Sequence, residues 1–326
     1  MIKAIRLKNF KCFDCEEIKL GAVSLLTGLN GMGKSSVIQS LLMLRQSRLD
    51  GLLPSVGLEL NGSLIKLGTA KDVFNMWAVD DTLGISLEWV SGANVDFPVE
   101  YHREADVLKL TNKSIDSSIF KLIPFNDDFH YQKAERLGPR VTNAMSDYQV
   151  IGHRQIGSDG EYVGHFLHAY GDEPVSDRIL CHPSNGGLSL RHQVQKWLGD
   201  ISPGTEIDIG FHPEMDIVNI QYSFITGKQR SNKYRTTSVG FGLTYSLPVI
   251  VALLSSKPGG IVLIENPEAH LHPRGQFKMG ELISRVASTG VQVIVESHSD
   301  HVLNGIRLAV YDSILEPEKV AISYFN

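Results

Sequence analysis

The stretch from Gly28 to Ser35 constrains this sequence more than any other. It reads Gly-Leu-Asn-Gly-Met-Gly-Lys-Ser and fits the phosphate-loop pattern G-x-x-x-x-G-K-[ST] at every fixed position. An apolar run at 23–26 precedes it, and apolar residues at helical spacing follow it as far as about Arg48. The order strand, glycine-rich loop, helix is therefore predicted here.

Such a loop binds phosphate because its glycines let backbone N–H groups turn inward, at the positive end of a helix dipole. Lys34 can reach the β- and γ-phosphates, and the Ser35 hydroxyl can ligate Mg²⁺. The residues expected to contact the phosphates are Asn30, Gly31, Met32, Gly33, Lys34, Ser35 and Ser36.

A second apolar run, at 261–264, ends in the acidic sequence Glu265-Asn266-Pro267-Glu268. An acid at such a strand end can hold Mg²⁺ opposite Ser35. Glu265 follows Lys34 by 265 − 34 = 231 residues, a much longer separation than in small GTPases and kinases. A long insertion between the two elements is therefore expected.

The composition of the chain changes twice along its length. We expect 1–103 and 205–326 to form two parts of one α/β domain, and 104–204 to be an inserted helical or irregular lobe. Within the first part, alternating apolar residues predict short β-segments at 63–67 and 85–90.

The last part has the clearest pattern of elements. Residues 206–211 and 216–224 are predicted to form a β-pair, and from Ser238 onwards helices alternate with strands. This order predicts a parallel sheet covered on both faces. Pro248 lies inside the first of these helices and is expected to kink or break it.

The residues from Ile264 to Pro273 resemble the extended acidic motif D-E-P-E-x-x-L-H-P of ABC/SMC-like AAA-type ATPases. That group includes RecF-like, OLD-nuclease-like and many anti-phage defence ATPases. Three further stretches agree: the opening strand at 1–13, the signature loop at 237–242, and the strand end at 296–299, where the family keeps its switch histidine. The resemblance covers both ends of the chain but not the middle.

This resemblance implies a P-loop NTPase head with a mainly parallel core sheet, an antiparallel β lobe and an inserted segment. It also implies ATP and Mg²⁺ as cofactors, and a head-to-tail dimer that holds two nucleotides between phosphate loops and the partner's signature loops. By this analogy Ser238, Gly240 and Gly242 contact the γ-phosphate bound in the other subunit, and His298 contacts it as the switch residue.

Each of these two assignments has a simpler alternative. Ser238 can cap the helix that follows it and leave N–H groups free for an anion, or it can be a plain N-cap beside a turn glycine. His298 can equally be a hydrogen-bonded structural histidine at a strand end.

The sequence departs from the family pattern at the acidic pair. Members commonly carry Asp-Glu, with Asp for magnesium and Glu to polarise the attacking water, whereas this chain has Glu265-Asn266. Asn266 cannot act as a base, although it can orient a water. Glu268 can substitute as the base, or it can cap or pack the following turn. Slow hydrolysis is therefore expected, as in a timer or sensor.

The role implied by the resemblance is that of a sensor or regulator in anti-phage defence. The expected assembly is a homodimer or higher even oligomer that controls a separately encoded effector nuclease, as in a Septu-type pair. Two alternatives remain open: a RecF-like DNA repair clamp gated by ATP, and a scaffold that binds ATP without turnover.

The overall charge gives little support for nucleic-acid binding, since 31 basic and 36 acidic residues leave a net charge of −5. The basic clusters at 133–140 and 228–235 are each either a solvated charged turn or a surface that contacts DNA or a partner. No apolar run reaches about 18 residues, so no membrane span is expected and the cytoplasm is the default location.

Two groupings of metal-ligand residue types carry a weak signal. Cys12 and Cys15 form one C-x-x-C pair without a second pair. Glu268, His270 and His272 alternate on a predicted turn, where side chains rarely converge on one ion. We therefore expect no zinc site at either place.

Overall fold

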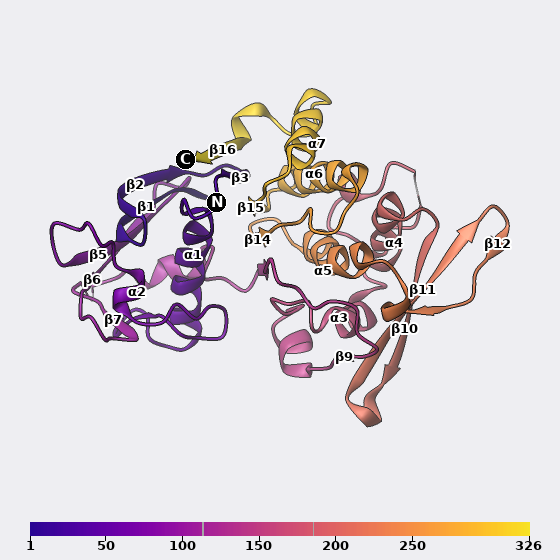
Figure 1. The fold of residues 1–326 in the computed structure, drawn as a ribbon, viewed down its shortest axis with the longest axis horizontal. Helices are drawn as coiled ribbons and strands as arrows, with labels where there is room; N and C mark the ends of the chain where they lie inside the picture. Colours follow the sequence, from indigo (N-terminus) through magenta and orange to yellow (C-terminus); the bar gives the residue numbers. More distant parts are fainter. Residues whose placement is uncertain (113, 185) are drawn as a thin grey trace. The chain divides into compact units, whose positions relative to one another are not determined.

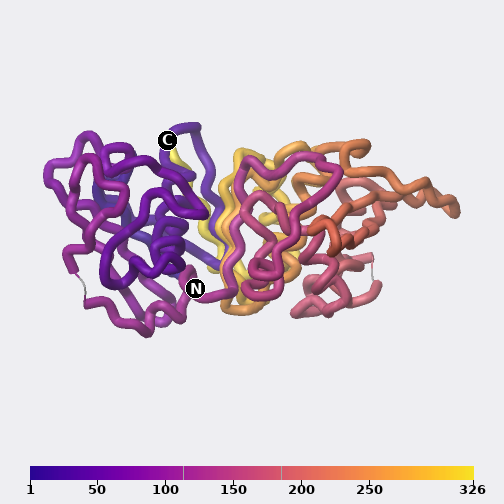
Figure 2. Tube along the Cα trace, turned by 90° about the horizontal axis from the view of Figure 1, so that it is seen from below, coloured from indigo at the N-terminus to yellow at the C-terminus, as the bar shows by residue number. Residues whose placement is uncertain are grey.

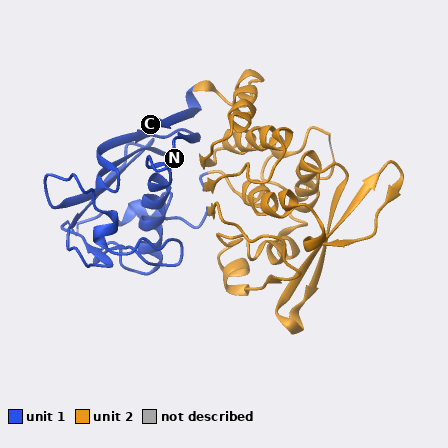
Figure 3. Ribbon diagram, viewed as in Figure 1, with its two compact units in different colours: residues 1–129, 259–261, 318–326 blue, residues 130–258, 262–317 orange. Residues whose placement is uncertain are grey.

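The computed structural model describes residues 1–112, 114–184 and 186–326. The chain forms two compact units, coloured separately in Figure 3. Unit 1 comprises 1–129, 259–261 and 318–326, and unit 2 comprises 130–258 and 262–317. The three-segment division by composition stays a prediction, because a compact unit need not coincide with a family domain.

Unit 1 contains an antiparallel sheet with the strand order β2-β1-β5-β6. Its central strands alternate between buried and exposed side chains, as expected for a sheet with one face on a core. The strands are β1 (Ile2–Phe10), β2 (Phe13–Lys19), β5 (Thr82–Trp89) and β6 (Asn94–Glu100). This sheet is the expected antiparallel lobe.

The phosphate-loop sequence of unit 1 connects β3 (Val23–Gly28) to α1 (Lys34–Leu49). The strand β16 (Val320–Phe325) pairs in parallel with β3, so both ends of the chain lie in this unit (Figure 1). Three short elements and one 3₁₀ turn complete the unit: β4 (Gly57–Glu59), α2 (Ala70–Val73), β7 (Val107–Lys109) and a turn at Ser117–Lys121.

Unit 2 combines a small sheet with the longer helices. The strands β15, β14 and β8 are neighbours in that order. Helix α6 packs against α7, and α4 packs against α5 (Figure 1). The bounds are β8 (Phe129–Gln132), α3 (Val163–Tyr170), α4 (Leu190–Ile201), α5 (Phe241–Ser255), β14 (Ile261–Glu265), α6 (Pro273–Ser288), β15 (Gln292–Glu296) and α7 (Asp300–Tyr311).

A long antiparallel hairpin is the other feature of unit 2. It consists of β10 (Thr205–His212) and β11 (Ile217–Thr226), in the register Ile207↔Tyr222. The turn that follows β11 and leads into the short strand at Gln229–Arg230 projects beyond the helices of its unit (Figure 2). Three two-residue strands pair with β11: β9 (Asn143–Ala144), β12 (Gln229–Arg230) and β13 (Tyr234–Arg235).

The predicted class, an α/β fold with parallel and antiparallel sheets, is confirmed, but one local prediction is wrong. Residues 63–67 form no strand, and only an isolated bridge joins Asn61 to Lys66. Helix α5 continues through Pro248 to Ser255, so the proline does not break it, and the alternative of a kink stays a prediction. Among the described residues, no helix is both long and apolar enough to cross a bilayer.

Candidate functional site: a phosphate loop and an acidic turn

The phosphate loop of unit 1 uses backbone conformations that favour glycine. Gly28, Gly31 and Gly33 all have positive φ, at 127°, 81° and 101°. At Gly28 the chain also passes close to β16, because an added Cβ would lie 2.0 Å from the carbonyl oxygen of Phe325. At Gly31 an added Cβ would meet nothing within 4 Å, so this side of the loop is open.

Lys34 is buried beneath this loop, with 3% of its surface exposed. Its Nζ donates to the carbonyl oxygens of Gly28 at 3.0 Å and Leu29 at 2.5 Å. The ammonium group is therefore held at the start of the 16-residue helix α1, where the helix dipole also favours an anion. Positive charge, open backbone and helix N-terminus together fit a bound polyphosphate.

The acidic turn of unit 2 begins where β14 ends. Glu265 accepts hydrogen bonds at both carboxylate oxygens, from the Tyr131 hydroxyl at 2.9 Å and the Ala134 N–H at 3.1 Å. Burial, followed by the charge of Glu265, raises the pKa of Tyr131 well above its ordinary value. The phenol therefore stays protonated and acts as the donor. A carboxylate oxygen has further lone pairs, so these contacts are compatible with a Mg²⁺ ligand.

Asn266 occupies a left-handed backbone conformation, with φ of 45°. Asparagine tolerates this conformation better than most residues with a side chain. Its N–H donates to the carbonyl of Glu296 at 2.9 Å, which ties the turn to the end of β15. Its Oδ1 is buried without a hydrogen-bond partner in the described chain and can accept a hydrogen bond from a water.

Glu268 lies beside the end of the next strand. Its Oε1 accepts from the backbone N–H of His298 at 2.8 Å. Its Oε2 is buried and has no hydrogen-bond partner within the described ranges. One oxygen is thus fixed, and the other has no donor among the described residues and can accept a further hydrogen bond. The fold therefore brings together the predicted residues Glu265, Asn266, Glu268 and His298.

His298 itself is exposed, and its neighbour Ser299 begins α7. Ser299 Oγ accepts from the N–H groups of His301 at 3.1 Å and Val302 at 3.2 Å, which makes it the N-cap of that helix. The backbone around His298 is therefore well fixed, while its ring faces solvent.

The predicted capping role of Ser238 is wrong. Ser238 ends a short 3₁₀ turn at Thr236–Ser238, and Gly240 is the N-cap of α5. Both residues are exposed. Gly242 lies in the first turn of α5, where an added Cβ would come within 2.8 Å of the carbonyl oxygen of His270. The start of α5 thus packs directly on the acidic turn.

Arg136 contacts the site and was not anticipated as a site residue. The interpretation of 133–140 as a solvated charged turn is wrong at this position, since Arg136 is 2% exposed. Burial lowers its pKa to about 10, while the charges of Glu268 and Glu265 oppose that shift. The guanidinium therefore stays charged at neutral pH. The clustered charges at 133–140 were the only signal in the sequence.

Two of the four cations in the second basic cluster pair with acidic residues of β10. Arg230 pairs with Glu206 at 2.8 Å, and Lys233 pairs with Asp208. These exposed pairs reduce the local positive potential that a DNA backbone would meet. The hairpin therefore gives little support to the expectation of a DNA-binding surface.

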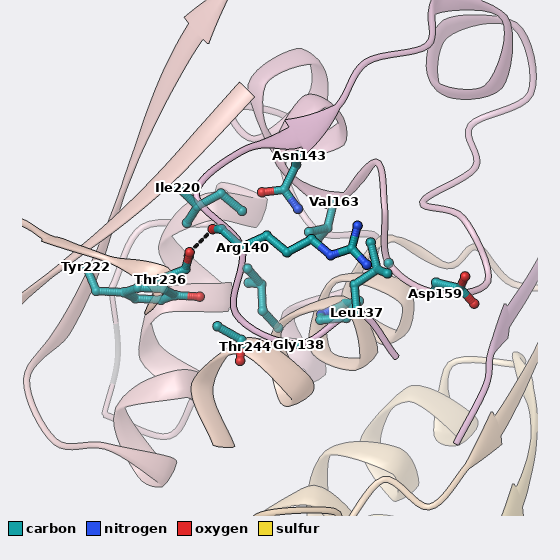
Figure 4. A pocket seen from close by; sticks show the side chains of 13 residues that line it. Leu137, Gly138, Arg140, Asn143, Asp159, Val163, Ile220, Tyr222, Thr236 and Thr244 are labelled. Carbon is teal, nitrogen blue, oxygen red and sulfur yellow. Dashed lines mark hydrogen bonds between the residues drawn. The ribbon is translucent and has the colours of Figure 1, made fainter. Parts of the chain in front are cut away.

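A small cavity lies beside α5 in unit 2 (Figure 4). Its volume is about 20 Å³, which suits one water rather than a nucleotide. Tyr222 and Thr236 line one side of it, and Asp159 lies on the other.

Across the parts of the chain that the structure describes, no group of three or more His, Cys, Asp or Glu residues could hold a metal ion.

Comparisons with known proteins identify related sequences at both ends of the chain. A family described as "AAA ATPase domain" matches residues 1–148. A second family, described as "AAA domain, putative AbiEii toxin, Type IV TA system", matches residues 184–304. No curated protein matches the sequence.

The chain is also similar in fold to solved SMC head domains. One is the SmcHead bound to the C-winged helix domain of ScpA, with 11% identity, coverage of 93% of this chain and 92% of that one, and a TM-score of 0.51. Another is the Pyrococcus furiosus Smc head with an extended coiled coil bound to the C-terminal domain of ScpA, with 12% identity, 93% and 91% coverage, and a TM-score of 0.50. At these identities the likeness concerns the fold alone.

Proposed function

We propose that the chain is an ATPase of the ABC/SMC-like AAA type, which binds ATP with Mg²⁺ and hydrolyses it slowly. The matches to two AAA-domain families and the similarity in fold to an SMC head support this proposal. The arrangement of Glu268 carries this proposal. A carboxylate with one oxygen held by the His298 N–H and the other free is suited to take a proton from water.

The residues divide the work between the two units. Asn30 to Ser36 hold the phosphates, and Ser35 and Glu265 hold Mg²⁺, which would neutralise charge on the phosphate oxygens. Asn266 orients the attacking water through its Oδ1, and Glu268 takes the proton. The joint action of Ser35 and Glu265 rests on the family resemblance, because they lie in different units.

Slow turnover follows from the replacement of the second acid by Asn266. We expect fewer than about one ATP hydrolysed per second, at the low end of typical enzyme rates. Lys34→Ala should reduce turnover at least ~100-fold by removing the cation from the phosphates. Glu268→Gln should reduce kcat about 10²–10⁴-fold and leave ATP binding intact, because the amide keeps the shape but cannot accept the proton.

The measurement is steady-state ATP turnover with Mg²⁺, alongside ATP binding by calorimetry. Turnover that persists in Lys34→Ala would contradict the proposal. Tight ATP binding without any turnover in the wild type would favour the alternative of a nucleotide-binding scaffold.

For the biological role, we propose an ATP-dependent dimer or higher even oligomer that senses or regulates a separate effector, such as a nuclease, in anti-phage defence. The match to a family described as a putative AbiEii toxin supports a link to toxin or defence systems. A RecF-like DNA clamp is the alternative, and duplex DNA binding that appears only with ATP would favour it.

A further inference from the structure

Arg136 is a buried cation that packs against the acidic turn, and it donates hydrogen bonds to backbone carbonyls. Its Nη1 donates to the carbonyl of Glu265 at 2.7 Å, and its Nη2 donates to that of Asn266 at 2.8 Å. Nη1 also donates to Lys133 O at 2.6 Å, and Nε donates to Tyr245 O at 3.0 Å. One planar group therefore joins the 133–136 segment, the acidic turn and helix α5.

A rigid guanidinium is suited to this task. Its donors point in fixed directions, so carbonyls that bind to it are fixed relative to one another. The two carbonyls belong to Glu265 and Asn266, whose side chains form part of the candidate site. The same segment supplies the Tyr131 hydroxyl and the Ala134 N–H that hold the Glu265 carboxylate. Backbone and side chain of Glu265 are thus held from one side by one stretch of chain.

The contact with α5 falls where that helix is short of internal hydrogen bonds. Pro248 has no N–H to donate to the carbonyl of Thr244, one turn earlier. Arg136 donates to the neighbouring carbonyl of Tyr245 in that same turn. The ring of Tyr245 also packs edge-on against His270, at 4.6 Å between centroids. Helix α5 therefore touches the acidic turn through Arg136 on one side and His270 on the other.

We propose that Arg136 is a positioning residue that locks the backbone of the acidic turn to the first two turns of α5, the helix that follows the signature loop at 237–242, so that a movement of this helix is passed to Glu265 and Asn266. This inference rests on the proposed ATP hydrolysis and adds a link between α5 and the proposed hydrolytic residues.

The test compares Arg136→Lys and Arg136→Gln with Arg45→Lys. Arg45 is a matched control: it is 5% exposed, and its Nη1 donates to the carbonyls of Pro124 and Asn126. These residues belong to unit 1, whereas the acidic turn belongs to unit 2. Three quantities are measured for each variant: kcat, the Kd for ATP with Mg²⁺, and hydrogen exchange in peptides covering 262–271 and 241–247.

We expect both Arg136 variants to lower kcat about 10–100-fold while Kd for ATP changes less than about threefold. Exchange should rise in both peptides, because the lysine keeps the charge but not the fork of donors. Arg45→Lys should leave kcat and these two peptides unchanged. A role in general stability alone would raise exchange throughout unit 2 and weaken ATP binding in parallel.

The outcomes separate this inference from the proposed function. If the wild type hydrolyses ATP and Arg136→Lys keeps its kcat, the inference is wrong and the function stands. If the wild type shows no turnover, the proposed ATP hydrolysis is wrong. The inference about Arg136 is then still tested by hydrogen exchange, and unchanged exchange at 262–271 in Arg136→Lys refutes it. Faster exchange confined to one of the two peptides also refutes the link between them.

Discussion

Asn266 suits the left-handed backbone conformation of the acidic turn, and in the proposed mechanism the proton is taken by its neighbour Glu268. Its φ of 45° suits asparagine, while the acid that usually follows the magnesium ligand is absent. The turn places Glu268 against the His298 N–H, with its second oxygen free of protein donors among the described residues. In the proposed mechanism the base and the water-orienting amide are therefore separate residues.

The glycines of the phosphate loop give a prediction at the same scale. Gly28→Ala should lower the free energy of unfolding by about 1–3 kcal/mol more than Gly31→Ala. Both alanines would be strained by the positive φ, which lowers the stability of each variant. Only the Cβ at position 28 would also clash with backbone, 2.0 Å from the carbonyl oxygen of Phe325. Urea unfolding of the two variants measures this difference. Equal losses in the free energy of unfolding would contradict the prediction and show that β16 can shift away from position 28 without loss of stability.

At the scale of elements, the pairing of α6 with α7 depends on two glycines. An added Cβ at Gly280 would lie 2.2 Å from the carbonyl oxygen of Val302, and one at Gly305 would lie 2.1 Å from that of Phe277. Glycine lowers helix stability by about 0.5–1 kcal/mol relative to alanine. Glycine is needed at both positions because the backbones of the two helices approach so closely that a Cβ would clash. Helix α7 begins at Asp300, two residues after His298, so this packing also fixes the backbone beside the proposed switch histidine.

Gly280→Ala should therefore destabilise the protein by about 2 kcal/mol, despite its better helix propensity. Gly199→Ala is the matched control in α4, since an added Cβ there meets nothing within 4 Å. That variant should gain about 0.5–1 kcal/mol. Free energies of unfolding from denaturant titrations check both signs. A stabilised Gly280→Ala would mean that the helices separate easily.

At the scale of the whole molecule, the proposed function assigns roles to residues from both units and from a second copy. The two matched AAA families cover 1–148 and 184–304, so each carries one half of the expected residues. The exposed Ser238 and Gly240 at the start of α5 are available to a partner's phosphate.

The dimer proposal predicts that Glu268→Gln with ATP elutes as a dimer, because slow hydrolysis leaves the nucleotide in place. Adding Ser238→Glu should abolish this association, since its carboxylate would face phosphate charge. Ser117→Glu, on an exposed turn of unit 1, is the control and should still dimerise. Light scattering with and without ATP gives the mass, and a Ser238→Glu variant that still dimerises would argue against the signature contact.

Much of the fold could be read from local patterns in the sequence. The strand, loop and helix around Gly28–Ser35 and the strand ending at Glu265 were predicted because apolar periodicity and glycine placement are local properties. The segment 63–67 has the alternation of a strand but pairs only through one bridge, because alternation does not specify a partner.

The sequence by itself predicted a phosphate-binding loop and an acidic motif, since the residues that make up each motif follow one another directly in the chain. Only the tertiary structure decided which groups surround Glu265. Tyr131, Arg136 and Tyr245 are distant in the chain and meet at the acidic turn through folding. Charge patterning could not show that Arg136 is buried, because burial depends on which segments pack over it. The Ser238 cap failed for the same reason: the path of the chain into α5, rather than the residue type, placed Gly240 at the helix start.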